Sequence, residues 1–323
     1  MKLFVGCDLG GTNLRAALVD VENGKVLFQK SIATLARQGP EAVMKRMAEL
    51  VLDVIRFGGY SPSEVGGIGI GAPGLLDLEK GETLFLTNFA GNWPHVPLCA
   101  TIQRLTSLST ALINDARAIT FGEWRYGAGQ GVETMVVFAL GTGVGGGLVI
   151  NGQLHFGLSG SAGEIGHIVL DPEGPRCGCG NRGCLEVYAS GPAIAAMGMK
   201  MVAQGLATQI ATLCEGDYNR ITAALIAQAA QEGDAIAQEI YDRAGEALGK
   251  AAATLCVTLS PQRIVLTGGV AQAGDLLLHP MRETLRRLAR VIPVDQVEVV
   301  LGKLGDQAGV LGAACFAAQN ISE

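Results

Sequence analysis

The sequence predicts an α/β protein in which one domain is duplicated, with a cleft between the two copies. A strand, a glycine-rich loop, a second strand, an Asn-Gly pair and a third strand begin at residue 3, and the same series begins again at residue 134. The interval is far longer than the roughly 20–50 residues of solenoid repeats. The chain of 323 residues, of which 49% are hydrophobic, is also long enough for two domains with cores of their own.

The first copy combines short apolar strands with one amphipathic helix. Its strands are predicted at residues 3–7, 15–21, 26–29, 65–72 and 110–113. Asn23-Gly24 joins two of them as a hairpin turn, because both residue types tolerate positive φ. Apolar residues at helical spacing predict a helix over residues 40–57, with Pro40 in its first turn.

The second copy repeats this order and adds a long helical region. Its strands are predicted at residues 134–140, 148–150, 263–267 and 297–301, with a glycine loop over 141–147 and a second hairpin turn at Asn151-Gly152. Helices dominate residues 191–259, and an alanine-rich helix is expected near residues 307–318. The predicted domains are therefore a small one at 1–115, joined by the C-terminal helix 306–323, and a large one at 116–305.

Composition excludes several classes of protein. The formal net charge of −6 argues against a nucleic-acid partner, which usually leaves a basic footprint. No apolar run reaches the ~18 residues of a membrane span, and Asp8 interrupts the apolar run that opens at Leu3, so no secretory signal is expected. Eight cysteines are too few for a disulfide scaffold in a chain of this length. We expect a soluble, cytoplasmic protein.

Three glycine loops follow buried strands, where backbone N–H groups can converge on an anion. A single such loop is most simply a tight turn, but two of the three occupy matching positions of the repeat. Residues 141–146 also fit G-x-G-x-x-G, yet that dinucleotide fingerprint needs a helix directly after the glycines, and here a strand follows. The sequence contains no G-x-x-x-x-G-K-[ST] phosphate loop.

Two phosphate-binding hairpins facing a cleft predict a nucleotide site of another kind. Asp8 heads the first loop and could hold a hydrated Mg²⁺, which needs few protein ligands beside phosphate oxygens and waters. The alternative for Asp8 is a turn-capping aspartate. The residues expected to bind the nucleotide are Asp8, Gly10, Gly11, Thr12, Asn13, Gly141, Thr142, Gly143, Gly268 and Gly269.

One loop, residues 167–184, has the ligands of a zinc site. His167, Cys177, Cys179 and Cys184 are a typical set for tetrahedral Zn²⁺, and the glycines between them form a loop that cannot bury a core. Unligated thiols are the alternative. Because four protein ligands close the coordination shell, this zinc should be structural, holding His167 and the neighbouring Glu164 and Glu186 toward the cleft.

These motifs together resemble the ROK family (repressors, open reading frames and sugar kinases) over nearly the whole chain. The matching segments are Asp8-Leu9-Gly10-Gly11-Thr12, Ala72-Pro73-Gly74, Asn114-Asp115-Ala116, Gly163-Glu164-Ile165-Gly166-His167 and Cys177-Gly178-Cys179-Gly180-Asn181-Arg182-Gly183-Cys184-Leu185-Glu186. Residues 171–175 are most similar to the bacterial glucokinase branch. The resemblance implies the actin and hexokinase fold, in which ATP binds between two ribonuclease-H-like domains.

The resemblance also implies roles for individual residues. It makes Asp115 the catalytic base, which takes a proton from the sugar hydroxyl as that oxygen attacks the γ-phosphate. Asp115 alone could instead be an N-cap, and Glu164 and Glu186 solvated loop carboxylates. One more asparagine is expected to bind sugar, and we prefer Asn88 to Asn92. The implied sugar-binding residues are Gly74, Asn88, Asn114, Asp115, Glu164, His167 and Glu186.

The expected activity is ATP-dependent phosphorylation of a hexose, first of all D-glucose to glucose 6-phosphate. The alternative is a kinase for another sugar: N-acetylmannosamine, N-acetylglucosamine, allose or fructose. A sugar-responsive repressor would carry a helix-turn-helix before the first strand, for which the sequence leaves no room, and Asp115 argues against an inactive sugar-binding scaffold. The family likeness suggests a homodimer or homotetramer.

Overall fold

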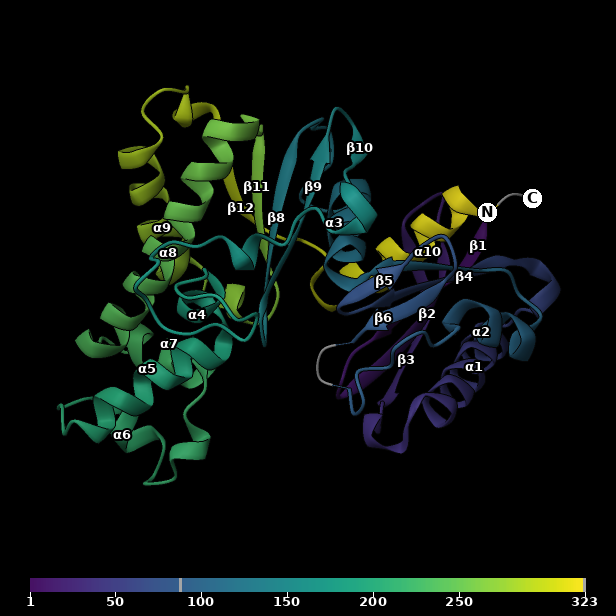
Figure 1. Ribbon diagram of the computed structural model, residues 1–323, viewed down its shortest axis with the longest axis horizontal. Helices are drawn as coiled ribbons and strands as arrows, with labels where there is room; N and C mark the ends of the chain where they lie inside the picture. The colour runs from purple at the N-terminus through teal and green to yellow at the C-terminus, as the bar shows by residue number, and fades with distance from the viewer. Residues whose placement is uncertain (87–88, 322–323) are drawn as a thin grey trace. The chain divides into compact units, whose positions relative to one another are not determined.

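The computed structural model describes residues 1–86 and 89–321, and the chain divides into two compact units (Figure 1). The first unit contains residues 1–131, residues 153–163 and the C-terminal segment that starts at Lys303. The second unit contains residues 132–152 and 164–302. The first unit extends beyond the predicted boundary at residue 115 because the helix that begins there packs against the C-terminal helix.

The first unit is built on a five-stranded sheet of order β3-β2-β1-β4-β7. β1, β2 and β3 are antiparallel neighbours, whereas β4 and β7 run parallel to β1. These strands are β1 (Leu3–Leu9), β2 (Asn13–Asp20), β3 (Lys25–Ala33), β4 (Val65–Ala72) and β7 (Thr110–Asn114). A separate pair is formed by β5 (Leu75–Asp77) and β6 (Glu82–Phe85).

Four helices cover this sheet: α1 (Pro40–Phe57), α2 (Leu98–Thr106), α3 (Asp115–Tyr126) and α10 (Ala308–Asn320). The apolar faces of α1 and α2 share one core with β1 and β4. α10 lies directly on β1 and β4 because glycines there leave room for its backbone. A Cβ on Gly6 or on Gly69 would stand only 1.8 Å from a carbonyl oxygen of α10, Val310 or Ala313.

A second sheet, of order β10-β9-β8-β11-β12, repeats the strand order of the first, and all of its strands except β10 belong to the second unit. β8 and β9 form an antiparallel hairpin, and β11 and β12 are parallel to β8. The strands are β8 (Met135–Leu140), β9 (Val144–Ile150), β10 (Gln153–Leu154), β11 (Arg263–Thr267) and β12 (Glu298–Leu301). The predicted duplication of an α/β domain is therefore confirmed, since two sheets of one topology arise from two parts of the chain.

The glycine loop predicted over residues 141–147 is wrong in its extent, because β9 already begins at Val144. Gly145, Gly146 and Gly147 pair with β8 as part of the strand. Their small size serves packing rather than a turn: a Cβ on Gly146 would lie 2.3 Å from the Ile165 side chain. The turn itself comprises only residues 141–143.

Helices account for most of the second unit: α4 (Glu186–Ala189), α5 (Gly191–Ala203), α6 (Gln209–Leu213), α7 (Ala223–Gln231), α8 (Ala235–Leu259) and α9 (Asp275–Leu288). α8 and α9 approach closely at Gly245 and Gly249, where a Cβ would lie 2.8 Å and 2.7 Å from α9 carbonyl oxygens. Within residues 1–86 and 89–321, none of the helices combines the length and apolar character that a membrane span requires.

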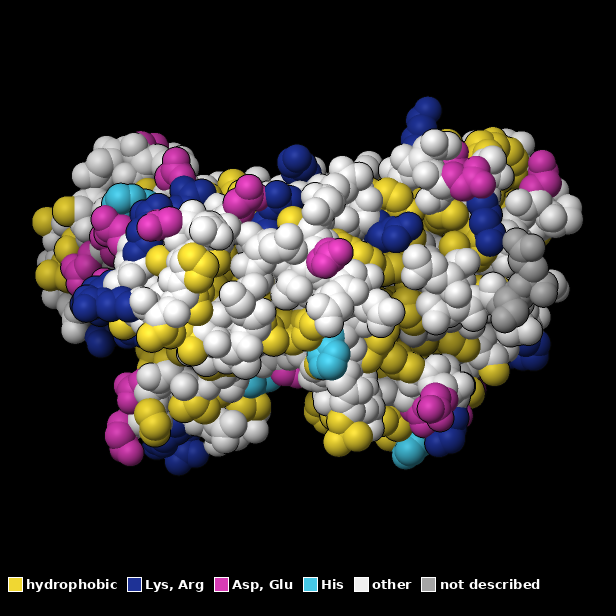
Figure 2. All heavy atoms as spheres, turned by 90° about the horizontal axis from the view of Figure 1, so that it is seen from above, with side chains coloured by type: hydrophobic (Ala, Val, Ile, Leu, Met, Phe, Trp, Pro, Cys, Tyr) yellow, Lys and Arg dark blue, Asp and Glu magenta, His cyan; other side chains and the backbone are white. Residues whose placement is uncertain are grey.

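The surface seen in Figure 2 carries basic and acidic side chains next to one another rather than in separate fields. Ion pairs between partly exposed side chains include Lys30 with Asp53 and Arg263 with Glu298. Such exposed pairs contribute little to stability, typically about 0–1 kcal/mol each. The stability of each unit therefore comes mainly from its own hydrophobic core and not from these ion pairs.

Candidate functional site

The structure brings the predicted site residues together in two groups, one in each unit. In the first unit they gather at the carboxyl ends of β1, β4 and β7. Asp8 pairs with Gly71 across the sheet, and a Cβ on Gly71 would lie 3.7 Å from Cα of Asp115. Two carboxylates thus flank one glycine at this edge of the sheet, the edge where α/β proteins commonly bind ligands.

The turn between β1 and β2 is the first predicted phosphate cradle. Gly10 N–H donates to Asn13 O at 3.0 Å and closes the turn. Thr34, fully buried at the end of β3, donates its hydroxyl to Gly10 O at 2.6 Å and its N–H to Thr12 O at 2.8 Å. Because C=O and N–H point in opposite directions across a trans peptide, the N–H groups of Gly11 and Asn13 face away from Thr34. Thr34 therefore orients the cradle, a role that the sequence analysis missed.

Asp8 is a partly buried carboxylate in a region of mixed charge. Arg15 contacts Asp8 at 3.6 Å and the exposed Asp306 at 3.7 Å. Burial, and then the charge of Asp115, raise the pKa of the Asp8 carboxyl to about 6, while Arg15 acts in the opposite direction. A carboxyl in this state favours a bound cation, since a divalent ion would offset the repulsion between the two carboxylates.

Asn114 and Asp115 mark the junction of β7 and α3. Asn114 is the N-cap of α3, and its side-chain oxygen accepts from the N–H groups of Ala116 and Arg117 at 3.0 Å and 3.3 Å. Its amide nitrogen donates to Gly74 O at 3.3 Å. Asp115 accepts a 2.7 Å hydrogen bond from Ala116 N–H and occupies the first position of the helix, where the helix dipole favours negative charge.

The turn at Gly74 holds the backbone in a conformation that glycine favours, with φ of +79°, and a Cβ there would lie 2.1 Å from Phe85 O. The preferred asparagine, Asn88, lies outside the described residues. The alternative, Asn92, is exposed with φ of +53°, and its backbone bonds to Leu86 and Phe89 shape the loop.

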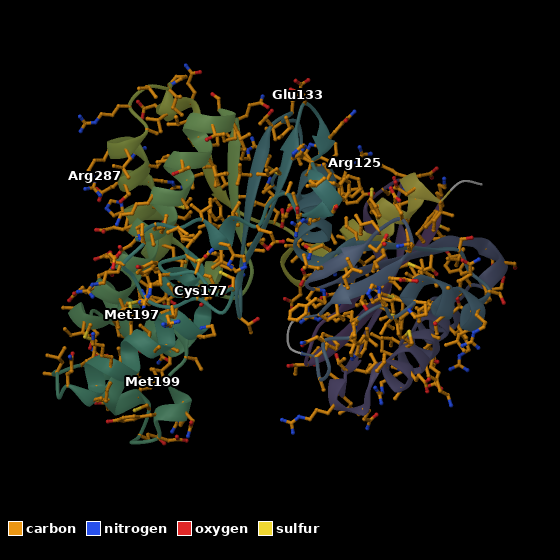
Figure 3. The ribbon with its side chains drawn as sticks, in the orientation of Figure 1. Arg125, Glu133, Cys177, Met197, Met199 and Arg287 are labelled. Atoms are coloured by element: carbon orange, nitrogen blue, oxygen red, sulfur yellow. The ribbon has the colours of Figure 1, made fainter. Side chains whose placement is uncertain are left out.

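The second group centres on the predicted zinc ligands. One donor atom each of His167, Cys177, Cys179 and Cys184 lies within 4.8 Å of all the others, and the cysteines form no disulfide. The Cys179 and Cys184 sulfurs are 3.7 Å apart, and Cys177 Sγ is 3.8 Å from Nδ1 of His167. Figure 3 labels Cys177 within the second unit. The local spacing in the sequence therefore predicted a real cluster.

The loop folds tightly around these four donors. The Leu170 N–H donates to Gly183 O and the Gly183 N–H donates to Pro175 O, each at 2.8 Å, and Val169 forms an isolated β-bridge with Cys184. Gly183 has φ of +62°, and a Cβ there would lie 1.7 Å from Asp171 O, so no larger residue fits this conformation. The backbone itself, and not only the thiols, is shaped to bring the four donors together.

The donor geometry fits a tetrahedral zinc ion. With Zn–S bonds of about 2.3 Å, two sulfurs of a tetrahedral site lie about 3.8 Å apart, close to the 3.7 Å between those of Cys179 and Cys184. Burial raises the pKa of Cys177 and brings that of Cys184 to about 12, whereas the Asn181 N–H lowers the pKa of Cys179. A metal ion would deprotonate all three thiols on binding. Since Nδ1 of His167 faces the sulfurs, its Nε2 is left for another partner.

Glu186 connects the zinc loop with the second glycine turn. Its Oε1 lies 3.8 Å from Cys177 Sγ, and its Oε2 accepts from Val144 N–H at 3.0 Å. A Cβ on Gly143 would lie 2.5 Å from the same oxygen, so the glycine makes room for the carboxylate. Glu186 was predicted to bind sugar, and the structure adds this contact with the turn.

The two remaining glycine turns lie next to each other in the second unit. Gly191, at the start of α5, donates to Gly141 O at 2.9 Å, which directs the Thr142 N–H the opposite way. Gly268 has φ of +94°, and a Cβ there would lie 2.3 Å from Leu140 O. Residues 141–143 and 268–269 therefore form one continuous backbone surface with the N-terminus of α5.

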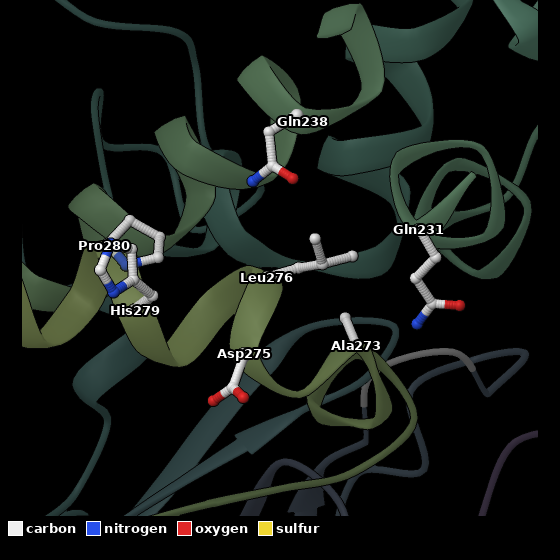
Figure 4. Close-up of a pocket in the computed structure, with 7 residues that line it drawn as sticks. All are labelled: Gln231, Gln238, Ala273, Asp275, Leu276, His279 and Pro280. Carbon is white, nitrogen blue, oxygen red and sulfur yellow. The ribbon is translucent and has the colours of Figure 1, made fainter. Parts of the chain in front are cut away.

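A cavity of about 350 Å³ opens between α7, α8 and α9 (Figure 4). It begins only four residues after Gly269, at Ala273 in the short helix η6 (Val270–Ala273). No local pattern in the sequence predicts this cavity, because its walls come from separate helices. The lining residues are Gln231, Gln238, Ala273, Asp275, Leu276, His279 and Pro280.

The chain is similar to known proteins along nearly its whole length. The ROK family model matches residues 4–320. The glucokinase of Thermotoga maritima is 38% identical over 321 residues, 98% of either chain, and that of Halalkalibacterium halodurans is 36% identical over 324 residues, 98% of this chain and 96% of the relative. The crystal structure of a ROK family glucokinase from Streptomyces griseus, in complex with glucose and AMPPNP, has a TM-score of 0.85 at 33% identity and covers 98% of this chain and 100% of that one. The similarity spans both units.

Proposed function

Because the chain belongs to the ROK family, we propose that it is an ATP-dependent hexose kinase whose substrate is D-glucose and whose product is glucose 6-phosphate. The first unit would supply the general base and one phosphate cradle. The second would supply further sugar contacts and the other two glycine turns. The proposal requires that both groups of residues reach one pair of substrates.

One observation carries the proposal: Asp8 and Asp115 flank Gly71 beside the turn of residues 10–12. A phosphoryl-transfer site needs anion-binding N–H groups, a carboxylate for a divalent cation and a base within reach of the acceptor hydroxyl. These three parts lie at the ends of adjacent strands in the first unit. Asp8 is assigned to Mg²⁺, which would neutralise charge on the transferring phosphoryl group.

The residues of this chain then have distinct tasks in the reaction. Asp115 accepts the proton of the sugar hydroxyl as that oxygen attacks the γ-phosphorus, while the bond from this phosphorus to the bridging oxygen breaks and ADP leaves. The N–H groups of Gly11, Asn13 and Thr142 hold phosphate oxygens without a P-loop lysine. Most of the catalysis of phosphoryl transfer comes from aligning the sugar hydroxyl with the γ-phosphorus and from neutralising the charge of the phosphate oxygens.

Sugar recognition is assigned to polar groups around the zinc loop and the Asn114 cap. A hexose presents many hydroxyl groups, and a hydroxyl without its partner leaves a buried group unpaired. Glu164, the Nε2 of His167 and Glu186 are proposed to bind hydroxyls together with Asn114, Gly74 and Asn88. Zinc would act structurally, by fixing the His167 ring and the loop that precedes Glu186.

A coupled ADP-release assay with MgATP across hexoses and N-acetylhexosamines tests the proposal. We expect the highest kcat/KM with glucose. A clear preference for N-acetylmannosamine, N-acetylglucosamine, allose or fructose would move the assignment to the alternative substrate. The absence of sugar-dependent ADP release with every sugar would refute the kinase.

We further propose that the enzyme acts in the cytoplasm as a homodimer or homotetramer. All eight cysteines are free thiols, a state that a reducing compartment preserves. A cytoplasmic location also gives access to ATP. Analytical ultracentrifugation tests the assembly, and a monomer at working concentration would contradict it.

A further inference from the structure

Arg117 is a buried arginine at the start of α3, next to the proposed base. Only 2% of the residue is exposed. Its Nη1 donates to Oδ1 of Asn114 at 2.7 Å, and its Nη2 donates to Ala162 O at 2.6 Å. Burying a guanidinium is costly unless its donors are well placed, so two such short bonds indicate a defined task.

The first bond fixes which way the Asn114 amide faces. Oδ1 accepts from Arg117 Nη1 and from the N–H groups of Ala116 and Arg117, while Nδ2 donates to Gly74 O. An amide oxygen only accepts and an amide nitrogen only donates, so three donors on one side exclude the flipped orientation. Asn114 therefore presents N–H donors toward the Gly74 turn. The shortest of the three bonds that enforce this comes from Arg117.

The second bond joins α3 to residues 153–163, another part of the first unit. Ala162, the acceptor, lies two residues before Glu164 in the chain. The Phe156 ring of this segment also packs 5.8 Å from that of Phe316 in α10, and within the segment the Ala162 N–H donates to Phe156 O. Gly157, Gly160 and Gly163 have positive φ, so the backbone over residues 157–163 is irregular. Arg117 supplies the polar anchor of this loop.

We propose that Arg117 is a positioning residue of the sugar site, which sets Asn114 as a hydrogen-bond donor and ties it to the loop that leads to Glu164. The planar fork of arginine suits this task, because two of its nitrogens reach two oxygens from separate parts of the chain. The inference rests on the proposed function, where Asn114 binds a sugar hydroxyl. It predicts that the Asn114 amide nitrogen donates a hydrogen bond to the oxygen of that hydroxyl.

The test compares wild type, Arg117→Met, Arg117→Lys and Arg125→Met. Arg125, labelled in Figure 3, is exposed on the same helix and serves as the matched control. Affinities for glucose and for the series of monodeoxy glucose analogues are measured by calorimetry, and KM values for sugar and ATP by ADP release. We expect Arg117→Met to weaken glucose binding on the order of 10- to 100-fold, with KM for ATP changed less than about 2-fold.

The analogue series separates positioning from general damage. In wild type, one deoxy analogue loses the contact with Asn114 and binds more weakly than glucose; in Arg117→Met this difference should disappear, while the other differences remain. Equal weakening of glucose and every analogue would overturn the proposal. If Arg117→Met does not reach the native circular-dichroism spectrum, Arg117→Lys decides: wild-type affinity and selectivity in that variant would also overturn it. Failure of the kinase proposal is separate, since it shows as an absence of turnover in wild type.

Discussion

Replacing Asp115 by asparagine separates its chemical role from its structural one. The carboxylate accepts a 2.7 Å bond from Ala116 N–H at the first position of α3. An asparagine oxygen can accept the same bond, so the helix start should remain. The variant loses a negative charge at a helix N-terminus, worth about 0.3–1 kcal/mol of stability. It also loses the capacity to take a proton.

The magnitudes of these two losses differ enough to be distinguished. A positioned general base contributes roughly 10²- to 10⁴-fold to turnover, which corresponds to about 3–5 kcal/mol of barrier. We therefore expect Asp115→Asn to lose most of its kcat in the ADP-release assay. Binding of MgADP, measured by calorimetry, should change little, because the glycine turns are untouched. The melting temperature should fall by only a few degrees.

Glu41→Gln is the matched control, since it removes a carboxylate from the first turn of α1, where Glu41 is exposed. Its kcat should equal that of wild type. If Asp115→Asn kept kcat within about 3-fold of wild type, Asp115 could not be the base. If instead it lost MgADP binding together with turnover, the residue would act in the nucleotide site rather than on the sugar.

Three further predictions concern the metal loop, the pH response and the buried carboxylate of α3. Cys179→Ser should contain no bound zinc, measured by atomic emission, and its affinity for sugar should fall on the order of 10- to 100-fold. A metal-free variant with full activity would refute the positioning role of the loop. Since burial and Asp115 raise the pKa of Asp8 to about 6, kcat/KM for MgATP should fall as the pH drops through that value. The pKa of Asp8 is higher in the folded than in the unfolded protein, so ionising this carboxyl lowers the free energy of unfolding as the pH rises from about 4 to about 6. Asp8→Asn should therefore melt at a higher temperature than wild type at pH 7 while losing turnover. A lower melting temperature would contradict this. Glu123 is fully buried and accepts from the N–H groups of Ala128, Lys303 and Leu304 at 2.8–3.0 Å. Glu123→Gln has one acceptor oxygen in place of two and should lower the free energy of unfolding by about 2–4 kcal/mol in urea, whereas the exposed Glu239→Gln should be neutral.

The parts of the fold that the sequence predicted well have local causes. The predicted ends of α1 and β4 agree with the structure, because Pro40 starts the helix and a continuous apolar run defines the strand. The cluster of candidate zinc ligands followed from their spacing within one loop. The extent of the turn after β8 was wrong, since glycines allow both a loop and a tightly packed strand, and only the neighbouring Ile165 decides between them.

The residues that sequence reasoning missed depend on distant partners. Glu123 binds backbone groups about 180 positions further along the chain, and Arg117 binds one 45 positions away. In a helix, charged residues usually indicate a solvent-exposed face, so nothing in the local pattern predicted that these two are buried. Thr34 supports the first glycine turn from the end of another strand. Such roles become visible only once the topology places the elements side by side.

Glu186 gives a physical reason why a zinc ion in this loop would matter to the kinase although it would take no part in the phosphoryl transfer. A carboxylate placed against Val144 N–H could swing toward solvent, since α4 is only four residues long and too short to hold its own first residue. The zinc loop ends immediately before it, with Cys184 and Leu185 fully buried. A metal bound to Cys184 would therefore fix the start of α4, and with it the distance between Glu186 and the turn at residues 141–143. The proposed sugar contacts and the turn at residues 141–143 would then both depend on the position of Glu186. Loss of the metal should therefore weaken the binding of both sugar and nucleotide.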